Sequence, residues 1–268
     1  MNINRQSVTI SLILIKCRLL LLIILTGCAT YTNANQTKPL RIAVAANFYP
    51  VLKNLQPLFE LKTTKKIELI SGATGTLYQQ IMHGAPFDIF LSADAIRPQN
   101  LVNQGIAQKS SLNTYAVGQL ALWSATQTIY NIEQLQTHTG KLAIANPEIA
   151  PYGMAAKQAI SHLGLWHKLN KNLITGININ QTFQQVRSGS VKLGIVAKSQ
   201  LVLNKLQGVD IPAALYSPLQ QKAVIIKRTK QPQLAEQFMA FLMSYSVQNQ
   251  LENYGYQSAI ISKTLTHK

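Results

Sequence analysis

Four short segments have the residue types and spacing needed to bind an anion. In each, an apolar strand-like run ends, small polar residues follow, and a helix-like pattern begins. The segments are Ala46-Asn47, Ser71 to Thr76, Pro151-Tyr152-Gly153 and Asn178-Ile179. The first N–H groups of a helix have no intrahelical partner and carry a partial positive charge, so a helix start is a ready anion site. One such start is weak evidence, but four that face one cleft would surround a tetrahedral oxyanion.

These segments contain only uncharged residues, with no Asp, Glu, Lys or Arg among them. A protonated oxyanion such as hydrogen phosphate needs a hydrogen-bond acceptor at its site, usually a carboxylate. A site of neutral donors instead suits an anion that carries no proton at neutral pH, such as molybdate, tungstate or sulfate. Neutral donors also suit reversible capture, because a bidentate arginine pair would slow release.

The stretch around Asn47 indicates which elements position these donors. Residues 42–46 are small or β-branched, as in a parallel strand that is buried on both faces. Asn47 is a favoured helix N-cap, and Pro50 is tolerated in the first turn of the helix that follows. Open α/β sheets bind ligands at the carboxyl ends of their strands, which is where Asn47 is expected to lie.

The same order of strand, polar turn and helix recurs along the chain. Further strands are expected at 67–70, 88–91, 141–145, 173–177, 192–196 and 223–226. A βαβαβ series predicts parallel strands joined by right-handed crossovers. The long apolar run 115–123 contains a glycine and is interpreted as a crossing between two lobes. We therefore expect lobe I at 40–117 plus 223–268 and lobe II at 118–222, each a mostly parallel sheet flanked by helices.

The N-terminal region has the pattern of a targeting segment. Leu19 to Leu25 is an apolar run after two basic residues, far shorter than the roughly 18 residues of a membrane-spanning helix. Leu25-Thr26-Gly27-Cys28 resembles the box at which bacterial lipoproteins are cleaved before the cysteine is acylated. We expect a signal peptide at 1–27, lipidation of Cys28 and a polar tether at 28–39. The mature chain would then contain a single cysteine, so neither an intramolecular disulfide nor a cysteine metal site is expected.

The charge balance limits the classes of partner. The chain has a formal net charge of +16, although only 13% of its 268 residues are charged. A basic balance can reflect nucleic acid, an anionic membrane surface or an anionic ligand. The Lys and Arg residues are scattered, without a basic run interleaved with aromatic residues, so nucleic-acid binding is not expected.

Five motifs resemble a known family. AVAANF, SGATGTLYQQI, GAPFDIFLSAD, PYGMAA and GIVAKSQ stand in the order and spacing of the periplasmic molybdate-binding proteins of ABC importers, which are type II solute-binding proteins. The resemblance runs from about residue 40 to residue 256. It implies an α/β class, two-lobed periplasmic-binding-protein-like fold with the ligand cleft between the lobes.

The resemblance also implies which residues hold the oxyanion. Carried over position by position, they are Asn47 with the N–H of Ala46, Ser71, the N–H of Tyr152 and the N–H of Ile179, without a protein-bound metal. Ser71 and Thr74 are both candidates for the hydroxyl ligand, and Ser71 is favoured. Some members add a tyrosine hydroxyl just after the strand of the GIV motif, where this chain has Ala197. The chain therefore resembles the subgroup that uses the asparagine after the first strand.

The function expected from these features is extracytoplasmic capture of molybdate or tungstate for the membrane permease of an ABC importer. The protein is expected to act as a monomer in the periplasm or at the cell surface, held to a membrane by lipidated Cys28, without a cofactor or catalytic residues. Another oxyanion such as sulfate is the alternative ligand. A hydrolase that uses Ser71 is a further alternative, although the chain lacks a G-x-S-x-G elbow. The sensing domain of a transcription regulator would share the two-lobed form but would need an attached helix-turn-helix.

Overall fold

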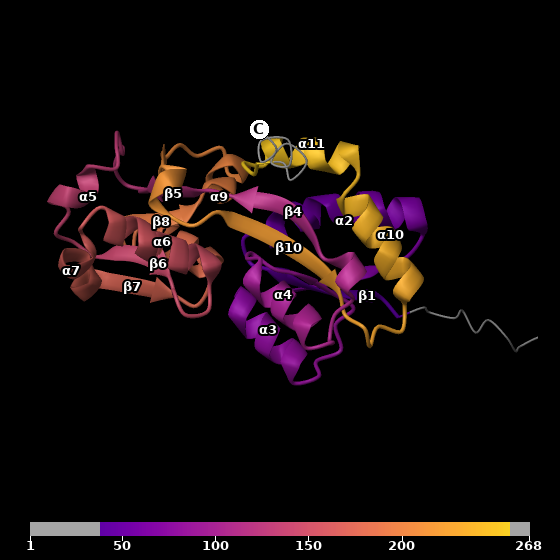
Figure 1. Ribbon diagram of the computed structural model, residues 1–268. Helices are drawn as coiled ribbons and strands as arrows, with labels where there is room; N and C mark the ends of the chain where they lie inside the picture. The colour runs from indigo at the N-terminus through magenta and orange to yellow at the C-terminus, as the bar shows by residue number, and fades with distance from the viewer. Residues whose placement is uncertain (1–37, 258–268) are drawn as a thin grey trace, which may run out of the picture. The chain divides into compact units, whose positions relative to one another are not determined.

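The computed structural model describes residues 38–257, which form two five-stranded sheets with helices packed against them (Figure 1). The expected signal peptide, Cys28 and most of the expected tether lie outside the described residues. Among residues 38–257, no helix combines the length and the hydropathy needed to cross a bilayer.

The first sheet belongs to lobe I and has the strand order β2-β1-β3-β10-β4. Its strands are β1 (Leu40–Ala45), β2 (Ile67–Gly72), β3 (Ile89–Leu91), β4 (Asn113–Gly118) and β10 (Leu219–Ile225). The helices of lobe I are α2 (Tyr49–Thr63), α3 (Thr74–Met82), α4 (Ile96–Asn103), α10 (Pro232–Leu242), α11 (Tyr245–Asn253) and the 3-10 turn η1 (Lys109–Ser111). β1 pairs in parallel with β2 and β3, whereas β10 runs antiparallel to β3 and β4.

The second sheet belongs to lobe II and has the order β7-β6-β8-β5-β9. Its strands are β5 (Leu120–Trp123), β6 (Leu142–Ala145), β7 (Leu173–Gly176), β8 (Leu193–Ala197) and β9 (Val209–Asp210). The helices of lobe II are α5 (Gln134–Thr137), α6 (Pro151–His162), α7 (Trp166–Leu169), α8 (Ile179–Arg187), α9 (Lys198–Leu203) and the 3-10 turns η2 (Asn170–Asn172) and η3 (Ala213–Leu215). β6 pairs in parallel with β7 and β8, whereas β5 runs antiparallel to β8 and β9.

The chain crosses between the two sheets twice. The chain leaves lobe I after Gly118 at the end of β4 and enters lobe II at Leu120 in β5. It returns at Leu219, four residues before the expected strand, because the first half of β10 reads Leu-Gln-Gln-Lys and has no apolar strand signal. Each sheet is mixed rather than mostly parallel, since the strands next to the crossings run antiparallel to their neighbours.

The alternation of side chains along β1 explains how lobe I is layered. Ile42 and Val44 pack with Leu52 and Phe59 of α2 and with α10. Ala43, which points to the other face, packs with Leu77 of α3 and with α4. Figure 1 shows α2 and α10 on one side of this sheet and α3 and α4 on the other. β1 is therefore the doubly buried central strand that its small and β-branched residues predict.

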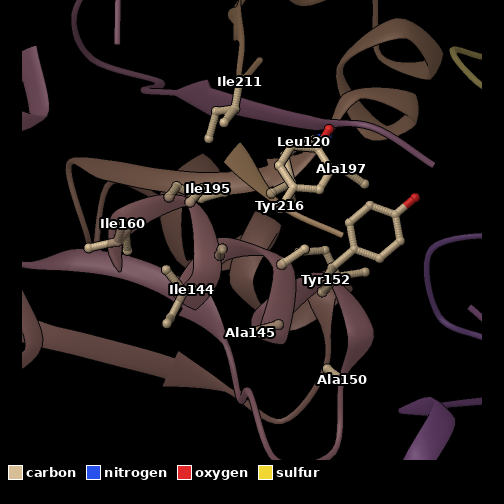
Figure 2. Close-up of a cluster of buried hydrophobic side chains, with 14 of the residues drawn as sticks. Leu120, Ile144, Ala145, Ala150, Tyr152, Ile160, Ile195, Ala197, Ile211 and Tyr216 are labelled. Atoms are coloured by element: carbon tan, nitrogen blue, oxygen red, sulfur yellow. The ribbon is translucent and has the colours of Figure 1, made fainter. Parts of the chain in front are cut away.

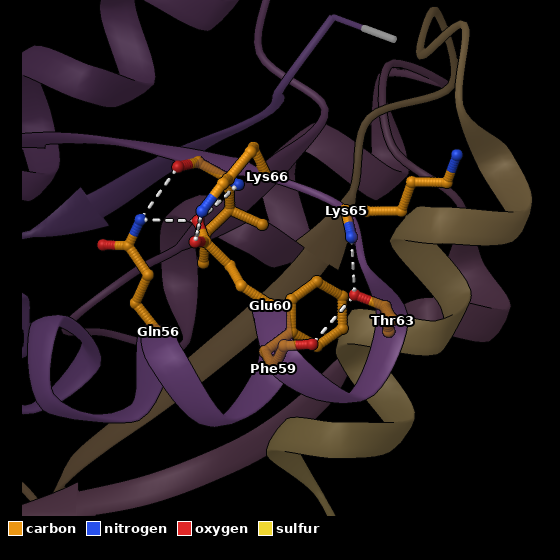
Figure 3. A network of polar contacts seen from close by, with 7 residues as sticks. Gln56, Phe59, Glu60, Thr63, Lys65 and Lys66 are labelled. Atoms are coloured by element: carbon orange, nitrogen blue, oxygen red, sulfur yellow. Dashed lines mark hydrogen bonds and ion pairs between the residues drawn. The ribbon is translucent and has the colours of Figure 1, made fainter. Parts of the chain in front are cut away.

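A polar cluster fixes the turn between α2 and β2 (Figure 3). The Glu60 carboxylate accepts hydrogen bonds from Lys66 Nζ at 2.7 Å, Gln56 Nε2 at 2.9 Å and the Ile67 N–H at 3.1 Å. Burial pushes the pKa of Glu60 upward, but the hydrogen bonds from Lys66, Gln56 and Ile67 outweigh it and lower the pKa from 4.5 to about 2. The ionised carboxylate thus stabilises the folded state.

Replacing Glu60 with glutamine should lower the free energy of unfolding by about 1 kcal/mol at pH 7. The folded-state pKa lies below the unfolded value of 4.5, so the contribution is complete above about pH 4.5 and is lost as the pH falls through about 2. The destabilisation should therefore shrink at pH 2. Urea unfolding of the wild type, Glu60→Gln and the exposed-site control Glu252→Gln at both pH values measures this. An equal loss of stability at pH 7 and pH 2 would contradict the assignment.

Candidate functional site

A small pocket lies where the four predicted segments meet. It is lined from lobe I by Ala45, Ala46, Asn47, Gly72, Ala73, Thr74 and Ala93, and from lobe II by Ala150, Pro151, Tyr152, Asn178 and Ile179. All of these residues are uncharged. The residues come from the ends of β1 and β2, from the turn after β3 and from the starts of α3, α6 and α8. The lining thus brings together Ala46, Asn47, Tyr152 and Ile179, but it does not include Ser71.

Strand register explains why segments far apart in the sequence emerge side by side. In lobe I, Ala45 at the end of β1 is opposite Gly72 at the end of β2. In lobe II, Ala145 at the end of β6 is opposite Gly176 at the end of β7. Because each pair is parallel and ends in register, the polar segments that follow leave the sheet at the same edge.

The two helix starts of lobe II form as the sequence predicts. Pro151 occupies the first turn of α6, where its missing N–H costs no hydrogen bond. The Asn178 side chain caps α8 by accepting hydrogen bonds from the N–H groups of Asn180 and Gln181, each at 3.0 Å. The amides of Tyr152 and Ile179 make no hydrogen bond to residues 38–257. Both are therefore open donors in the first turn of a helix, next to the pocket.

Thr74, rather than Ser71, brings a hydroxyl to the pocket. β2 continues to Gly72, two residues beyond the predicted strand end, so Ser71 lies inside the strand opposite Val44 and is exposed. Thr74 is the first residue of α3 and is only 1% exposed. Its Oγ1 accepts a hydrogen bond from the Ala93 N–H at 3.1 Å, which leaves the hydroxyl proton to donate.

The amide of Ala46 is already used within lobe I. Its N–H donates to the carbonyl of Gly72 at 2.9 Å and extends the pairing of β1 with β2 by one residue. This N–H, which the sequence predicts to contact the anion, therefore has a backbone partner in the structure. The next amide, that of Asn47, makes no hydrogen bond to the described residues and lies in the pocket lining.

The Asn47 side chain is committed to protein partners. The prediction that Asn47 caps the helix after β1 is wrong, because the cap position of α2 is Phe48. Asn47 Nδ2 instead donates to Gln221 Oε1 at 2.9 Å and to the Tyr256 hydroxyl at 3.1 Å. The Tyr256 hydroxyl in turn donates to the Asn47 carbonyl at 2.9 Å. Gln221 and Tyr256 are too distant in the sequence for local patterns to have indicated this.

Buried tyrosines beside the pocket remain neutral. Burial raises the pKa of Tyr115 and Tyr152 well above the usual value, and it raises that of Tyr256 to about 12. Their hydroxyls therefore add no negative charge near the pocket at physiological pH. Residues 38–257 contain no group of three or more His, Cys, Asp or Glu side chains placed to hold a metal cation.

The lobes also touch at the rim of the pocket. The Gly75 N–H of α3 donates to the Ile149 carbonyl of lobe II at 2.8 Å. Arg97, which forms an ion pair with Asp94, donates to the Glu148 carbonyl at 3.3 Å. A groove of about 560 Å³ runs along this rim and is lined by residues of both lobes.

The chain is similar to known bacterial binding proteins. Residues 40–257 match the family described as "Bacterial extracellular solute-binding protein". The chain is 37% identical to the molybdate-binding protein ModA of Azotobacter vinelandii over 242 aligned residues. This alignment covers 88% of this chain and 96% of the relative. It is 39% identical over 218 residues to the ModA of Rhodobacter capsulatus, covering 80% and 86% of the two chains.

The solved structures include a close match in fold. The Azotobacter vinelandii periplasmic molybdate-binding protein superposes with a TM-score of 0.77 at 36% sequence identity. The alignment covers 81% of this chain and 98% of that structure. The two-lobed α/β fold expected from the sequence is thereby confirmed.

Proposed function

Because this chain belongs to the bacterial extracellular solute-binding proteins, we propose that it captures molybdate and delivers it to the membrane permease of an ABC importer. Tungstate, which has the same charge and tetrahedral form, is the second expected ligand. The observation that carries this proposal is the pocket itself, where uncharged donors from the ends of β1 and β2 and the starts of α6 and α8 surround one small space.

The pocket chemistry supports a doubly charged, proton-free anion. Burying such an anion is costly unless its oxygens are hydrogen-bonded. In our proposal the donors are the amides of Asn47, Thr74, Tyr152 and Ile179 together with the Thr74 hydroxyl. Thr74 replaces Ser71 because it lines the pocket and Ser71 does not. The lining offers no carboxylate to accept a hydrogen bond from the hydroxyl of hydrogen phosphate, which should therefore bind poorly.

A thermal-shift panel with molybdate, tungstate, sulfate and phosphate tests the proposal. Ligand at 100 times its dissociation constant adds about 2.7 kcal/mol to stability, which corresponds to a rise of about 5–10 °C in Tm for a chain of this size. We expect this rise with molybdate and tungstate and no rise with phosphate. A rise with sulfate alone would reassign the ligand, and no rise with any of the four anions would reject the proposal.

The position of Ser71 and the composition of the pocket lining do not favour a hydrolase. Ser71, the proposed nucleophile of that alternative, is exposed on β2 outside the pocket. The lining contains no His, Asp, Glu, Lys or Cys to transfer a proton. We therefore propose binding and release rather than catalysis.

The relatives are extracytoplasmic binding proteins, and this chain shares that location. We further propose that lipidated Cys28 anchors it to a membrane and that it works as a monomer. The apolar run followed by Leu-Thr-Gly-Cys supports the anchor. Mass spectrometry of the mature N-terminus tests it, since acylation adds the mass of the lipid to Cys28.

A further inference from the structure

Tyr152 has two ends with different surroundings. Its amide lies in the pocket at the start of α6, whereas its ring is buried, with only 2% of the residue exposed. Figure 2 shows the hydroxyl pointing away from the apolar side chains of lobe II such as Ile144 and Ile160. The hydroxyl instead accepts a hydrogen bond from Gln221 Nε2 at 3.1 Å and lies 3.5 Å from Asn47 Nδ2. A lobe II residue therefore contacts two side chains of lobe I.

This contact lies where the chain crosses between the lobes. Gly118 is the last residue of β4 before the first crossing, and Gln221 follows the second crossing in β10. A Cβ atom at Gly118 would lie 2.2 Å from the Tyr152 hydroxyl and 2.8 Å from Gln221 Nε2. Because Gly118 has no side chain, there is room for the Tyr152 hydroxyl at this position. The Tyr152 hydroxyl thus lies against both crossing strands, β4 and β10, which pair with each other.

The hydroxyl completes a buried set of polar contacts, which we call the hinge network: Asn47, Tyr115, Tyr152, Gln221 and Tyr256. Gln221 is fully buried, and its Oε1 accepts from Asn47 Nδ2 at 2.9 Å and from the Tyr115 hydroxyl at 3.0 Å. Its Nε2 is satisfied only by Tyr152 among residues 38–257. Tyr152 is the single lobe II member of the network. Without it, Gln221 would keep a buried donor with no partner, which is costly.

We propose that the Tyr152 hydroxyl is a positioning group that ties closure of the lobes to anion binding. Through Gln221 and Asn47 it holds lobe I against the helix start whose amide faces the anion, and it orients the Asn47 backbone at the pocket. The same residue thereby contributes an anion donor through its amide and a closure contact through its side chain. This inference rests on the proposed function, because it assigns a role within that binding site.

Titration calorimetry and stopped-flow dissociation of molybdate from Tyr152→Phe test the inference on the mature chain. Phenylalanine keeps the ring and the amide but removes the hydroxyl. We expect about tenfold weaker binding, mainly from faster dissociation. Tyr216→Phe is the matched control, because the Tyr216 hydroxyl is also largely buried but accepts from the Leu120 N–H within lobe II, at 3.2 Å. It should leave molybdate affinity within twofold of the wild type.

A double variant separates positioning from a general loss of stability. If Tyr152 acts through Gln221, then Tyr152→Phe combined with Gln221→Leu should bind no more weakly than Gln221→Leu alone. Wild-type affinity and dissociation rate in Tyr152→Phe would overturn the inference, as would equal weakening by Tyr216→Phe. If the wild type binds molybdate and Tyr152→Phe binds it equally well, the inference fails but the proposed function is retained. A wild-type protein that binds none of the four anions rejects both.

Discussion

Replacing Thr74 with alanine is expected to weaken molybdate binding about 10- to 100-fold. The substitution removes the one hydroxyl that reaches the pocket from the β2–α3 turn, and it leaves an anion oxygen without that donor. Loss of a partner by a buried polar group costs about 1–3 kcal/mol. Thr74→Ser should retain most of the affinity because it keeps the hydroxyl. Isothermal titration with molybdate measures all three proteins.

Ser71→Ala is the control for this experiment. Ser71 is exposed within β2 and outside the pocket lining, so its hydroxyl should be dispensable for binding. Because Thr74 Oγ1 also accepts the Ala93 N–H, the unfolding free energy of each variant is measured separately. Weak binding by Ser71→Ala together with unchanged binding by Thr74→Ala would show that the hydroxyl ligand is assigned to the wrong residue.

Replacing Gly75 with valine is expected to weaken binding by at least a similar amount without touching the anion. A Cβ at this position would lie 2.9 Å from the Ile149 carbonyl oxygen and 3.0 Å from Ile149 Cα. Arg97 Nη2 of lobe I would lie 3.1 Å away, but it is the end of a flexible side chain and can shift. Ile149 belongs to lobe II, so the clash with its backbone arises when the lobes close. Overpacking of this kind costs about 1–3 kcal/mol, which would favour an open form with fewer donors around the anion. Titration calorimetry, with small-angle scattering to follow closure, provides the measurement.

The neighbouring substitution Thr76→Val controls for the change in α3. Thr76 is exposed on the same helix and is already β-branched, so this variant places a valine in α3 at a solvent-facing position. It should bind molybdate normally. The Gly75 interpretation fails if Gly75→Val closes on molybdate as the wild type does, or if both variants lose affinity equally.

Both predictions follow from how donors are divided between the lobes. Asn47 and Thr74 approach the pocket from lobe I, and Tyr152 and Ile179 approach it from lobe II. An anion can use all of these donors only when the lobes are together, so binding and closure favour each other. Contacts at the rim and in the hinge network therefore influence affinity even though they do not touch the ligand.

Much of the fold was predictable because its signals are local. The small and β-branched run of β1 indicated a strand buried on both faces. Pro151 and Asn178 indicated the starts of α6 and α8 through the geometry of the first helical turn. β10 was recognised only in its apolar second half, since its Gln and Lys residues carry no strand signal even though Gln221 is buried in the hinge network.

Sequence alone determined that uncharged helix starts would gather at the sheet edges, because strand composition and capping preferences act over a few neighbouring residues. Only the tertiary structure decided which donors remain open to an anion. The Ala46 amide is taken by Gly72 across the β1–β2 pairing, and the Asn47 side chain is taken by Gln221, 174 residues away. Pairing with β1 extends β2 by two residues, which places Ser71 within the strand, and this is why we propose Thr74 instead as the hydroxyl ligand. A hydrogen-bond donor is available to a ligand only if no other group of the folded chain accepts its hydrogen bond. The accepting groups can be far away in the sequence, so the local sequence does not reveal them.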